Sequence, residues 1–125
     1  MAKRILIVED DAAMRQVLHL RLRSQNYDAV PVADAISAMT EARKQPPDLI
    51  IIDLGLPGGG GLNLIQRMQS IPRMAVIPVI VVSARERTAM EKPVLEAGAQ
   101  AFFQKPADPE LLLQKIRELL GETPT

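Results

Sequence analysis

Four short apolar runs of this sequence each end in residues that could bind a metal ion or take part in catalysis. Three consecutive acids, Glu9–Asp11, follow the first run, and Asp53 follows a second. Ser83 and Lys105 come after two others. Taken singly, each has an ordinary explanation, because an Asp after a strand commonly caps a helix and a Ser commonly forms a turn. If the fold brought these residues together, the site would combine several carboxylates with the hydroxyl of Ser83 and the ammonium of Lys105.

This combination points to phosphoryl transfer with a divalent metal ion. Clustered carboxylates raise each other's pKa unless a cation joins them. Oxygen ligands without Cys or His favour Mg²⁺ (or Mn²⁺), and bound Mg²⁺ also accepts phosphate oxygens. The carboxylate of Asp53 could attack phosphorus to form an aspartyl phosphate. The transfer needs positioning and charge neutralisation, which the metal ion, Lys105 and Ser83 would supply.

The elements that position these residues follow from hydrophobic periodicity. Short aliphatic runs rich in β-branched residues predict strands, and apolar residues at helical spacing predict amphipathic helices. Strands are expected at 5–8, 28–33, 49–53, 79–82 and 101–104, and helices at 12–24, 35–44, 62–70, 88–97 and 109–120. Pro31 predicts that the second strand lies at a sheet edge.

Local signals support the helix ends. Asp34 and Asp108 are expected N-caps, because their side chains can accept hydrogen bonds from the first turn. Gly98 and Gly121 are expected to end the fourth and fifth helices. Pro93 falls inside the predicted fourth helix, where it removes a backbone hydrogen bond and should shorten or kink the helix.

Aliphatic strands separated by helices predict a parallel sheet covered on both faces. The five-fold alternation fits a flavodoxin-like, doubly wound α/β fold with strand order 2-1-3-4-5 and five flanking helices. Ligands bind such sheets beyond the carboxyl ends of the strands. Strands one, three, four and five are neighbours in this order, so the candidate residues would converge. One domain over residues 1–121 is expected, followed by a polar tail at 122–125.

Composition narrows the function classes. The 125 residues suit a single domain. Fifteen acids balance fifteen bases, which argues against direct nucleic-acid binding, since such domains carry a basic excess. The chain has no cysteine and therefore no disulfide or thiolate chemistry. No apolar run approaches the roughly 20 residues of a membrane span, and the first is too short for a secretory signal. A cytoplasmic protein without membrane contacts is expected.

Four motifs follow one another along the chain: ILIVEDD, LIIIDLGLPGGGG, VIVVSA and FFQKP. In these motifs, their order and their spacing, residues Lys3–Gly121 resemble a receiver domain of a two-component response regulator. The resemblance implies that Asp53 is the phosphoacceptor and that a histidine kinase or phosphotransfer protein is the donor. It implies a regulatory role rather than an enzymatic one, with at most self-phosphorylation and slow autodephosphorylation. The effector domain or protein is not identified.

The resemblance also implies a metal site around the acceptor. Asp10 would bind Mg²⁺ directly and Glu9 through water, next to Asp53 itself. The backbone carbonyl of Gly55 would be a further ligand. Asp11 matches no ligand position and is interpreted as a helix cap.

Other positions would relay and tune the signal. Ser83 and Lys105 would contact the phosphoryl group, and Phe102 occupies the position of the switch aromatic. The face formed by the fourth helix, fifth strand and fifth helix would carry output or a weak homodimer, which Pro93 could alter. Gly55 offers no side chain to shield the phosphoryl group from water, so its lifetime would depend on whether Arg85 covers it.

Two other functions and one loop stay open at this point. A haloacid-dehalogenase-type phosphohydrolase also uses a strand-end Asp and Mg²⁺, but it expects a second Asp two positions on, where this chain has Gly55. A flavin- or cobalamin-binding flavodoxin-like domain is disfavoured by the acids after the first strand. The run Gly58–Gly61 is interpreted either as slack in the loop after the acceptor or as a source of mobility that affects metal or kinase docking.

Overall fold

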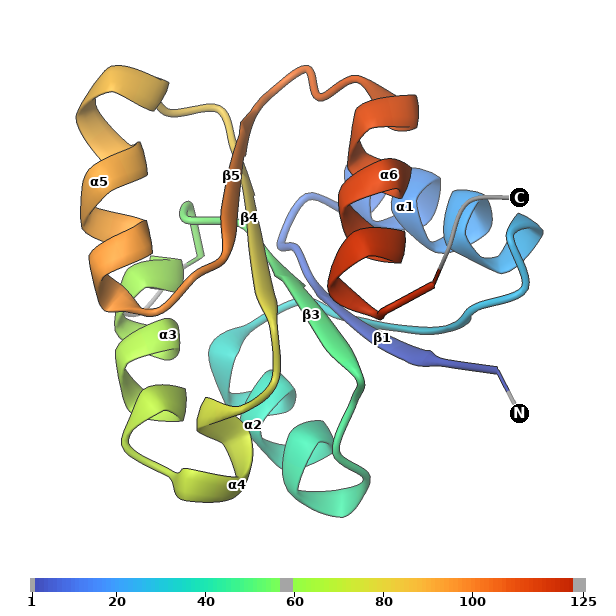
Figure 1. Cartoon of the computed structure of the whole chain (residues 1–125), viewed down its shortest axis with the longest axis horizontal. Coiled ribbons are helices and arrows are strands. Elements are labelled where there is room, and N and C mark those ends of the chain that lie inside the picture. Colours follow the sequence, from blue (N-terminus) through green and yellow to red (C-terminus); the bar gives the residue numbers. More distant parts are fainter. Residues whose placement is uncertain (1, 57–59, 123–125) are drawn as a thin grey trace.

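The computed structural model, which describes residues 2–56 and 60–122, confirms the predicted fold class (Figure 1). The strands are β1 (Arg4–Val8), β2 (Asp28–Val32), β3 (Leu49–Ile52), β4 (Val79–Ser83) and β5 (Ala101–Gln104). They form one parallel sheet in the order β2-β1-β3-β4-β5. β2 lies at an edge of the sheet, as expected. Proline is tolerated in an edge strand because its missing N–H can face away from the neighbouring strand.

The helices cover both faces of the sheet. They are α1 (Ala12–Ser24), α2 (Ala35–Lys44), α3 (Gly60–Gln69), α4 (Pro72–Ala75), α5 (Arg87–Ala97) and α6 (Pro109–Leu119). Helices α1 and α6 pack on one face, and α2, α3 and α5 pack on the other (Figure 1). Alternate residues of each strand therefore enter two separate cores, as the pleat of a strand requires.

The predicted number of five helices is wrong, because the described residues contain a sixth, short helix. Helix α3 ends at Gln69, and Pro72 stands in the first turn of the additional helix, α4. Proline is tolerated there, since its fixed φ suits a helix and its missing N–H would be free in any case. The third helix itself begins at Gly60, two residues earlier than predicted.

Pro93, expected to shorten or kink its helix, does not shorten it. Helix α5 runs continuously from Arg87 to Ala97 with Pro93 inside it. The next residue, Val94, is completely buried in the core between the sheet and helices α2, α3 and α5. Packing of this apolar face offsets the hydrogen bond that proline removes, because tertiary contacts supply most helix stability in proteins.

The predicted caps are confirmed. Asp34 accepts a hydrogen bond from the backbone N–H of Ser37 at 2.7 Å. Asp108 accepts one from Glu110 at 2.8 Å. Gly98 and Gly121 follow their helices with φ of 122° and 73°, a backbone region in which a Cβ is unfavourable.

The described chain ends in a contact with the body of the domain. The hydroxyl of Tyr27 donates a hydrogen bond of 2.6 Å to Glu122, the first residue of the expected tail. The division at residue 121 remains a prediction. In the ranges that the structure describes, no helix is long and apolar enough to cross a membrane.

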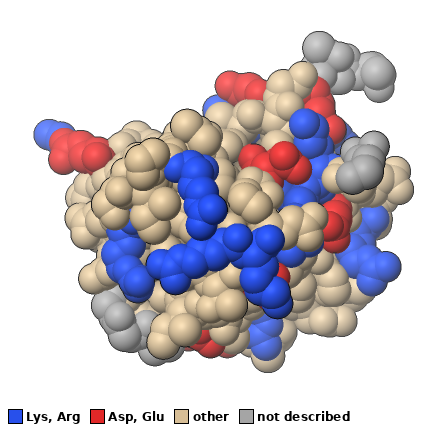
Figure 2. All heavy atoms as spheres, turned by 90° about the horizontal axis from the view of Figure 1, so that it is seen from below, with Lys and Arg blue, Asp and Glu red and all other residues tan. Residues whose placement is uncertain are grey.

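Basic residues gather at the end of the sheet where the strands begin. The last turns of α2 and α3 carry Arg43, Lys44 and Arg67, and α4 carries Arg73. Figure 2, which views the molecule from below, shows Lys and Arg spread across this face. Some of the bases at this end are paired with acids, since Arg4 forms ion pairs with Asp28 and Glu41, and Lys44 forms one with Glu41.

Candidate functional site

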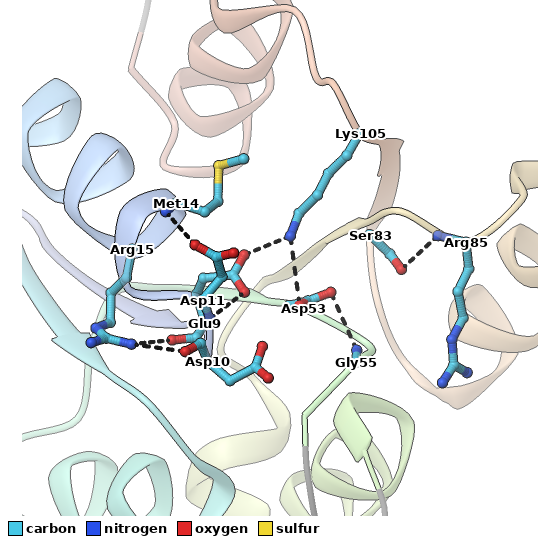
Figure 3. A network of polar contacts seen from close by, with 10 residues as sticks. All are labelled: Glu9, Asp10, Asp11, Met14, Arg15, Asp53, Gly55, Ser83, Arg85 and Lys105. Carbon is cyan, nitrogen blue, oxygen red and sulfur yellow. Dashed lines mark hydrogen bonds and ion pairs between the residues drawn. The ribbon is translucent and has the colours of Figure 1, made fainter.

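The predicted site residues meet at the carboxyl ends of the central strands (Figure 3). Carboxylate oxygens of Glu9, Asp10 and Asp53 lie within 4.8 Å of one another. Strand register causes this, because Val8 pairs with Ile52 and the loops that follow both residues start side by side. Glu9 and Asp53 are 2% and 9% exposed, whereas Asp10 faces solvent.

Lys105 reaches two of these carboxylates from the end of β5. Its Nζ donates a hydrogen bond of 2.7 Å to Glu9 Oε1 and lies 3.6 Å from Asp53 Oδ2. Burial opposes the charged form of Lys105, but the contacts with Glu9 and Asp53 outweigh burial and raise its pKa. Lys105 is therefore a fixed cation beside the predicted acceptor.

Glu9 has an unusually high proton affinity. Burial is the largest cause, and the neighbouring Asp53 adds to it, so that the pKa of Glu9 rises to about 7. Hydrogen bonds from Lys105 and from the N–H of Asp11 act in the opposite direction without cancelling it. The charged form of Glu9 is therefore disfavoured in spite of the Lys105 ammonium, and a further cation would favour it.

This raised pKa predicts a pH-dependent stability of the metal-free protein. Between pH 4.5 and about 7 an unfolded chain loses the Glu9 proton while the folded chain keeps it. The free energy of unfolding is therefore expected to fall as pH rises through this range. Urea unfolding with a chelator present, from pH 5 to 8, would measure this, and Glu9→Gln should flatten the profile. An equally steep profile in that variant would contradict the prediction.

Asp53 is held by its own loop. Its Oδ1 accepts a hydrogen bond of 3.2 Å from the N–H of Gly55, and its own N–H donates to the carbonyl of Val8 at 3.0 Å. A Cβ on Gly55 would lie 3.4 Å from Asp53 Oδ2, in ordinary contact. Gly55 thus places no side chain against the carboxylate. The role of its carbonyl as a metal ligand stays a prediction.

Two glycines of the run after the acceptor are structurally required, so their interpretation as slack is wrong. Gly60 has a φ of +76°, and a Cβ there would lie 2.9 Å from the carbonyl oxygen of Leu54. A Cβ on Gly61 would lie 2.4 Å from the carbonyl oxygen of Asp53 and 2.7 Å from Ile52 Cγ2. These glycines let α3 start directly against the acceptor's backbone. Gly58 and Gly59 lie outside the described residues.

Ser83 and Arg85 occupy the loop after β4. Ser83 is buried, and its Oγ accepts a hydrogen bond of 3.2 Å from the N–H of Arg85. The guanidinium of Arg85 points away from Asp53 (Figure 3). Only the backbone of Arg85 therefore contacts a site residue, and shielding of the acceptor by its side chain stays a prediction.

Sequence reasoning missed the role of Gln104. It is the register partner of Ser83 on β5, and its Oε1 accepts a hydrogen bond of 3.1 Å from the N–H of Arg87. Glu86, the N-cap of α5, makes no capping bond with its own side chain. Gln104, on the neighbouring strand, supplies the missing cap by accepting from the first turn of α5. The sequence offers one hint of this role, a polar residue directly before the Lys-Pro pair.

Phe102 and Asp11 lie where sequence reasoning placed them. Phe102 is buried in the core that contains its strand partner Val81, on the face covered by α5. Its inward position is therefore the observed one, and its role as a switch stays a prediction. Asp11 is confirmed as the N-cap of α1, because its Oδ1 accepts the N–H of Met14 at 2.9 Å.

The donor set fits a hard divalent cation. Glu9, Asp10 and Asp53 offer carboxylate oxygens only, the chemistry that Mg²⁺ selects. The pKa of Glu9, raised mainly by burial and further by Asp53, shows that its charged form is costly at this point. A cation at this cluster, with Lys105 beside it, would surround Asp53 with positive charge and prepare it to accept an anionic group.

Comparison with known proteins gives the same picture. Residues 5–117 match the family model described as the response regulator receiver domain. The DNA-binding response regulator MtrA of Mycobacterium tuberculosis is 32% identical over 120 residues, which are 96% of this chain and 51% of MtrA. The phosphate regulon transcriptional regulatory protein PhoB of Escherichia coli K12 is 33% identical over 120 residues, 96% of this chain and 52% of PhoB. The chain thus spans about half the length of these relatives.

Solved structures agree. A putative response regulator from Chloroflexus aurantiacus has a TM-score of 0.92 at 29% identity, covering 98% of this chain and 100% of its own. The receiver domain of the sensor histidine kinase PA1611 from Pseudomonas aeruginosa, solved with a magnesium ion in its active-site cleft, has a TM-score of 0.88 at 27% identity, with coverage of 98% and 100%. With the fold, the strand-end acids and the family match in agreement, this chain belongs to the response regulator receiver domain family.

Proposed function

We propose that Asp53 is the phosphoacceptor of this receiver domain and that Glu9, Asp10 and Asp53 hold the Mg²⁺ ion on which phosphorylation depends. The observation that carries the proposal is the cluster of these three carboxylates with the Lys105 ammonium on it. A cluster with this much uncompensated charge is costly to keep unless a cation and an anionic ligand complete it.

The residues would divide the chemistry among them. The bound metal ion supplies charge neutralisation at the phosphoryl oxygens. An oxygen of Asp53 forms a bond to phosphorus while the phosphorus–nitrogen bond of a donor phosphohistidine breaks, and the protonated ring leaves as neutral imidazole. Lys105, already 3.6 Å from Asp53 Oδ2, pairs with the transferred group. The hydroxyl of Ser83 donates to one of its oxygens.

The same bonds would relay the signal. Phosphorylation adds about −1.5 to −2 charges at this edge. A Ser83 hydroxyl that turns to the phosphoryl group changes its hydrogen bond with the N–H of Arg85, and the loop before α5 follows. Movement of this loop would alter the packing around Phe102. Because Phe102 has no hydroxyl to hydrogen-bond, packing alone decides between the inward and outward positions of its ring.

The output surface would be the face formed by α5, β5 and α6. A groove of about 710 Å³ lies there, with Leu95 and Leu111 on its walls. Both side chains are about half exposed, at 43% and 54%. This apolar pair would receive an effector domain or a second copy of the chain in a weak homodimer. The proposal of an effector is supported by the relatives MtrA and PhoB, which are named as a DNA-binding and a transcriptional regulator and of which this chain matches about half.

The phosphodonor would dock beside the acceptor on α1. Val17 and Leu20 are large apolar side chains exposed on this helix, at 46% and 56%. Val17 also lines a small groove of about 190 Å³ that reaches Lys105 and Pro106. A histidine kinase or phosphotransfer protein seated here would bring its phosphohistidine to the site. The expected cytoplasmic location of the chain stays a prediction.

The phosphohydrolase alternative lacks its second acid. A hydrolase that uses Asp53 as nucleophile needs an acid or base two residues on, and the Gly55 N–H that occupies this place only donates to Asp53. Nothing in the described residues favours that function over the receiver.

The test is phosphorylation of the protein by a small phosphodonor. Incubation with acetyl phosphate and Mg²⁺ is expected to add one phosphoryl group, detected by intact-mass spectrometry and localised to Asp53 by peptide mapping. Beryllofluoride with Mg²⁺ should shift the amide signals of Asp53, Ser83 and Lys105 in NMR spectra. A chelator should prevent both results. Wild-type protein that shows neither response would contradict the proposal.

A further inference from the structure

The three carboxylates of the site are held to different degrees. Glu9 is fixed by Lys105 and by the N–H of Asp11, and Asp53 is fixed by Lys105 and the N–H of Gly55. Within residues 2–56 and 60–122, the carboxylate of Asp10 takes part in no hydrogen bond or ion pair. Its position in the metal-free site therefore depends on the backbone that carries it.

That backbone is held by Arg15. Its Nη1 donates to the carbonyl oxygen of Glu9 at 2.9 Å and to that of Asp10 at 3.3 Å (Figure 3). Arg15 stands in the first turns of α1, and its own N–H donates to the carbonyl of Asp11 at 2.9 Å. One half-buried guanidinium thus ties two consecutive peptide groups of the acidic loop to the helix that follows.

We propose that Arg15 is a positioning residue of the metal site, which holds the loop so that Asp10 faces Glu9 and Asp53. The inference rests on the proposed Mg²⁺ site but adds a residue that contributes no ligand. A planar guanidinium suits this task, because one side chain can donate several hydrogen bonds in a fixed geometry, which an ammonium on a flexible stem does not reproduce.

Positioning and charge predict opposite results, so they can be separated. If Arg15 acted only through its positive charge, it would repel a divalent cation, and its removal would tighten metal binding. If Arg15 positions Asp10, its removal weakens metal binding although a repelling charge has gone. The substitution Arg15→Lys keeps the charge and loses the fixed geometry, and Arg15→Ala loses both.

The experiment is a calorimetric titration of the full chain with MgCl₂ above the pKa of Glu9. Both Arg15→Lys and Arg15→Ala are expected to weaken Mg²⁺ binding about tenfold, the usual effect of losing a residue that orients metal ligands. Arg23→Ala is the matched control, because Arg23 lies exposed in the last turn of the same helix and should leave the affinity unchanged. Urea unfolding of each variant separates loss of the loop geometry from loss of the fold.

A second readout needs no metal. In the metal-free variants the amide signals of Asp10 and Asp11 should shift and their hydrogen exchange should accelerate, with little change at Ser83 or Lys105. Wild-type affinity in Arg15→Lys, or tighter binding in Arg15→Ala, would overturn the positioning role and leave the receiver function intact. Absence of Mg²⁺ binding in the wild type would overturn both.

Discussion

Asp53→Asn is expected to lower phosphoryl incorporation from acetyl phosphate by about a thousandfold, because it removes the nucleophile while its neighbours remain. The asparagine amide has nearly the shape of the carboxylate, so Glu9, Asp10 and Lys105 keep their places. Intact-mass spectrometry after incubation with Mg²⁺ and the phosphodonor measures the effect. Asp11→Asn is the matched control, since Asp11 is the exposed N-cap of α1 and asparagine caps a helix equally well.

The same substitution should change the electrostatics of the metal-free site. Asp53 is one of the causes of the raised pKa of Glu9, so its neutralisation is expected to lower that pKa. The metal-free variant should then be more stable than the wild type at neutral pH, by about 1 kcal/mol, as is common when a functional site is relieved of like charges. Lost phosphorylation with unchanged stability would contradict this electrostatic account. Phosphorylation that survives in Asp53→Asn would move the acceptor elsewhere.

Gly61→Ala is expected to lower the free energy of unfolding by about 2–3 kcal/mol, the cost of overpacking a tight site. Its Cβ would lie 2.4 Å from the carbonyl oxygen of Asp53 and 2.7 Å from Ile52 Cγ2. Because one of these neighbours is backbone, either α3 or the end of β3 must move. Movement of β3 displaces Asp53, so Mg²⁺ binding should weaken as well. Urea unfolding and calorimetric titration measure the two effects.

Gly55→Ala is the comparison that isolates the close approach. Gly55 lies in the turn after β3 and Gly61 in the first turn of α3, but a Cβ on Gly55 would make an ordinary 3.4 Å contact with a side-chain oxygen of Asp53. Its effect on stability should stay within about 0.5 kcal/mol, the range of substitutions that remove no packing or cap. Equal losses in Gly55→Ala and Gly61→Ala would show that loop entropy, not contact with the acceptor's backbone, explains the glycines.

Much of the site could be predicted before any coordinates because the fold is periodic. Apolar runs of strand length mark the buried strands, and the order of a doubly wound sheet then brings the residues at their carboxyl ends together. Glu9, Asp53 and Lys105 directly follow or nearly follow such a run, and Ser83 ends one. Their convergence follows from topology alone.

Tertiary packing decided what periodicity does not encode. Pro93 stays inside α5 because Val94 is packed in the core. A proline inside a helix has a local cost of a few kcal/mol, and burial elsewhere in the element outweighs it.

The sequence by itself determined which chemical groups are present, on which strands they end, and therefore the family and the predicted acceptor, Asp53. Only the tertiary structure decided how each group is held. Gly61 is required by an approach of α3 to β3, Gln104 caps a helix that follows another strand, and Arg15 ties the loop that carries Asp10. Such contacts join segments whose distance is set by packing, and no periodic pattern along the chain records them.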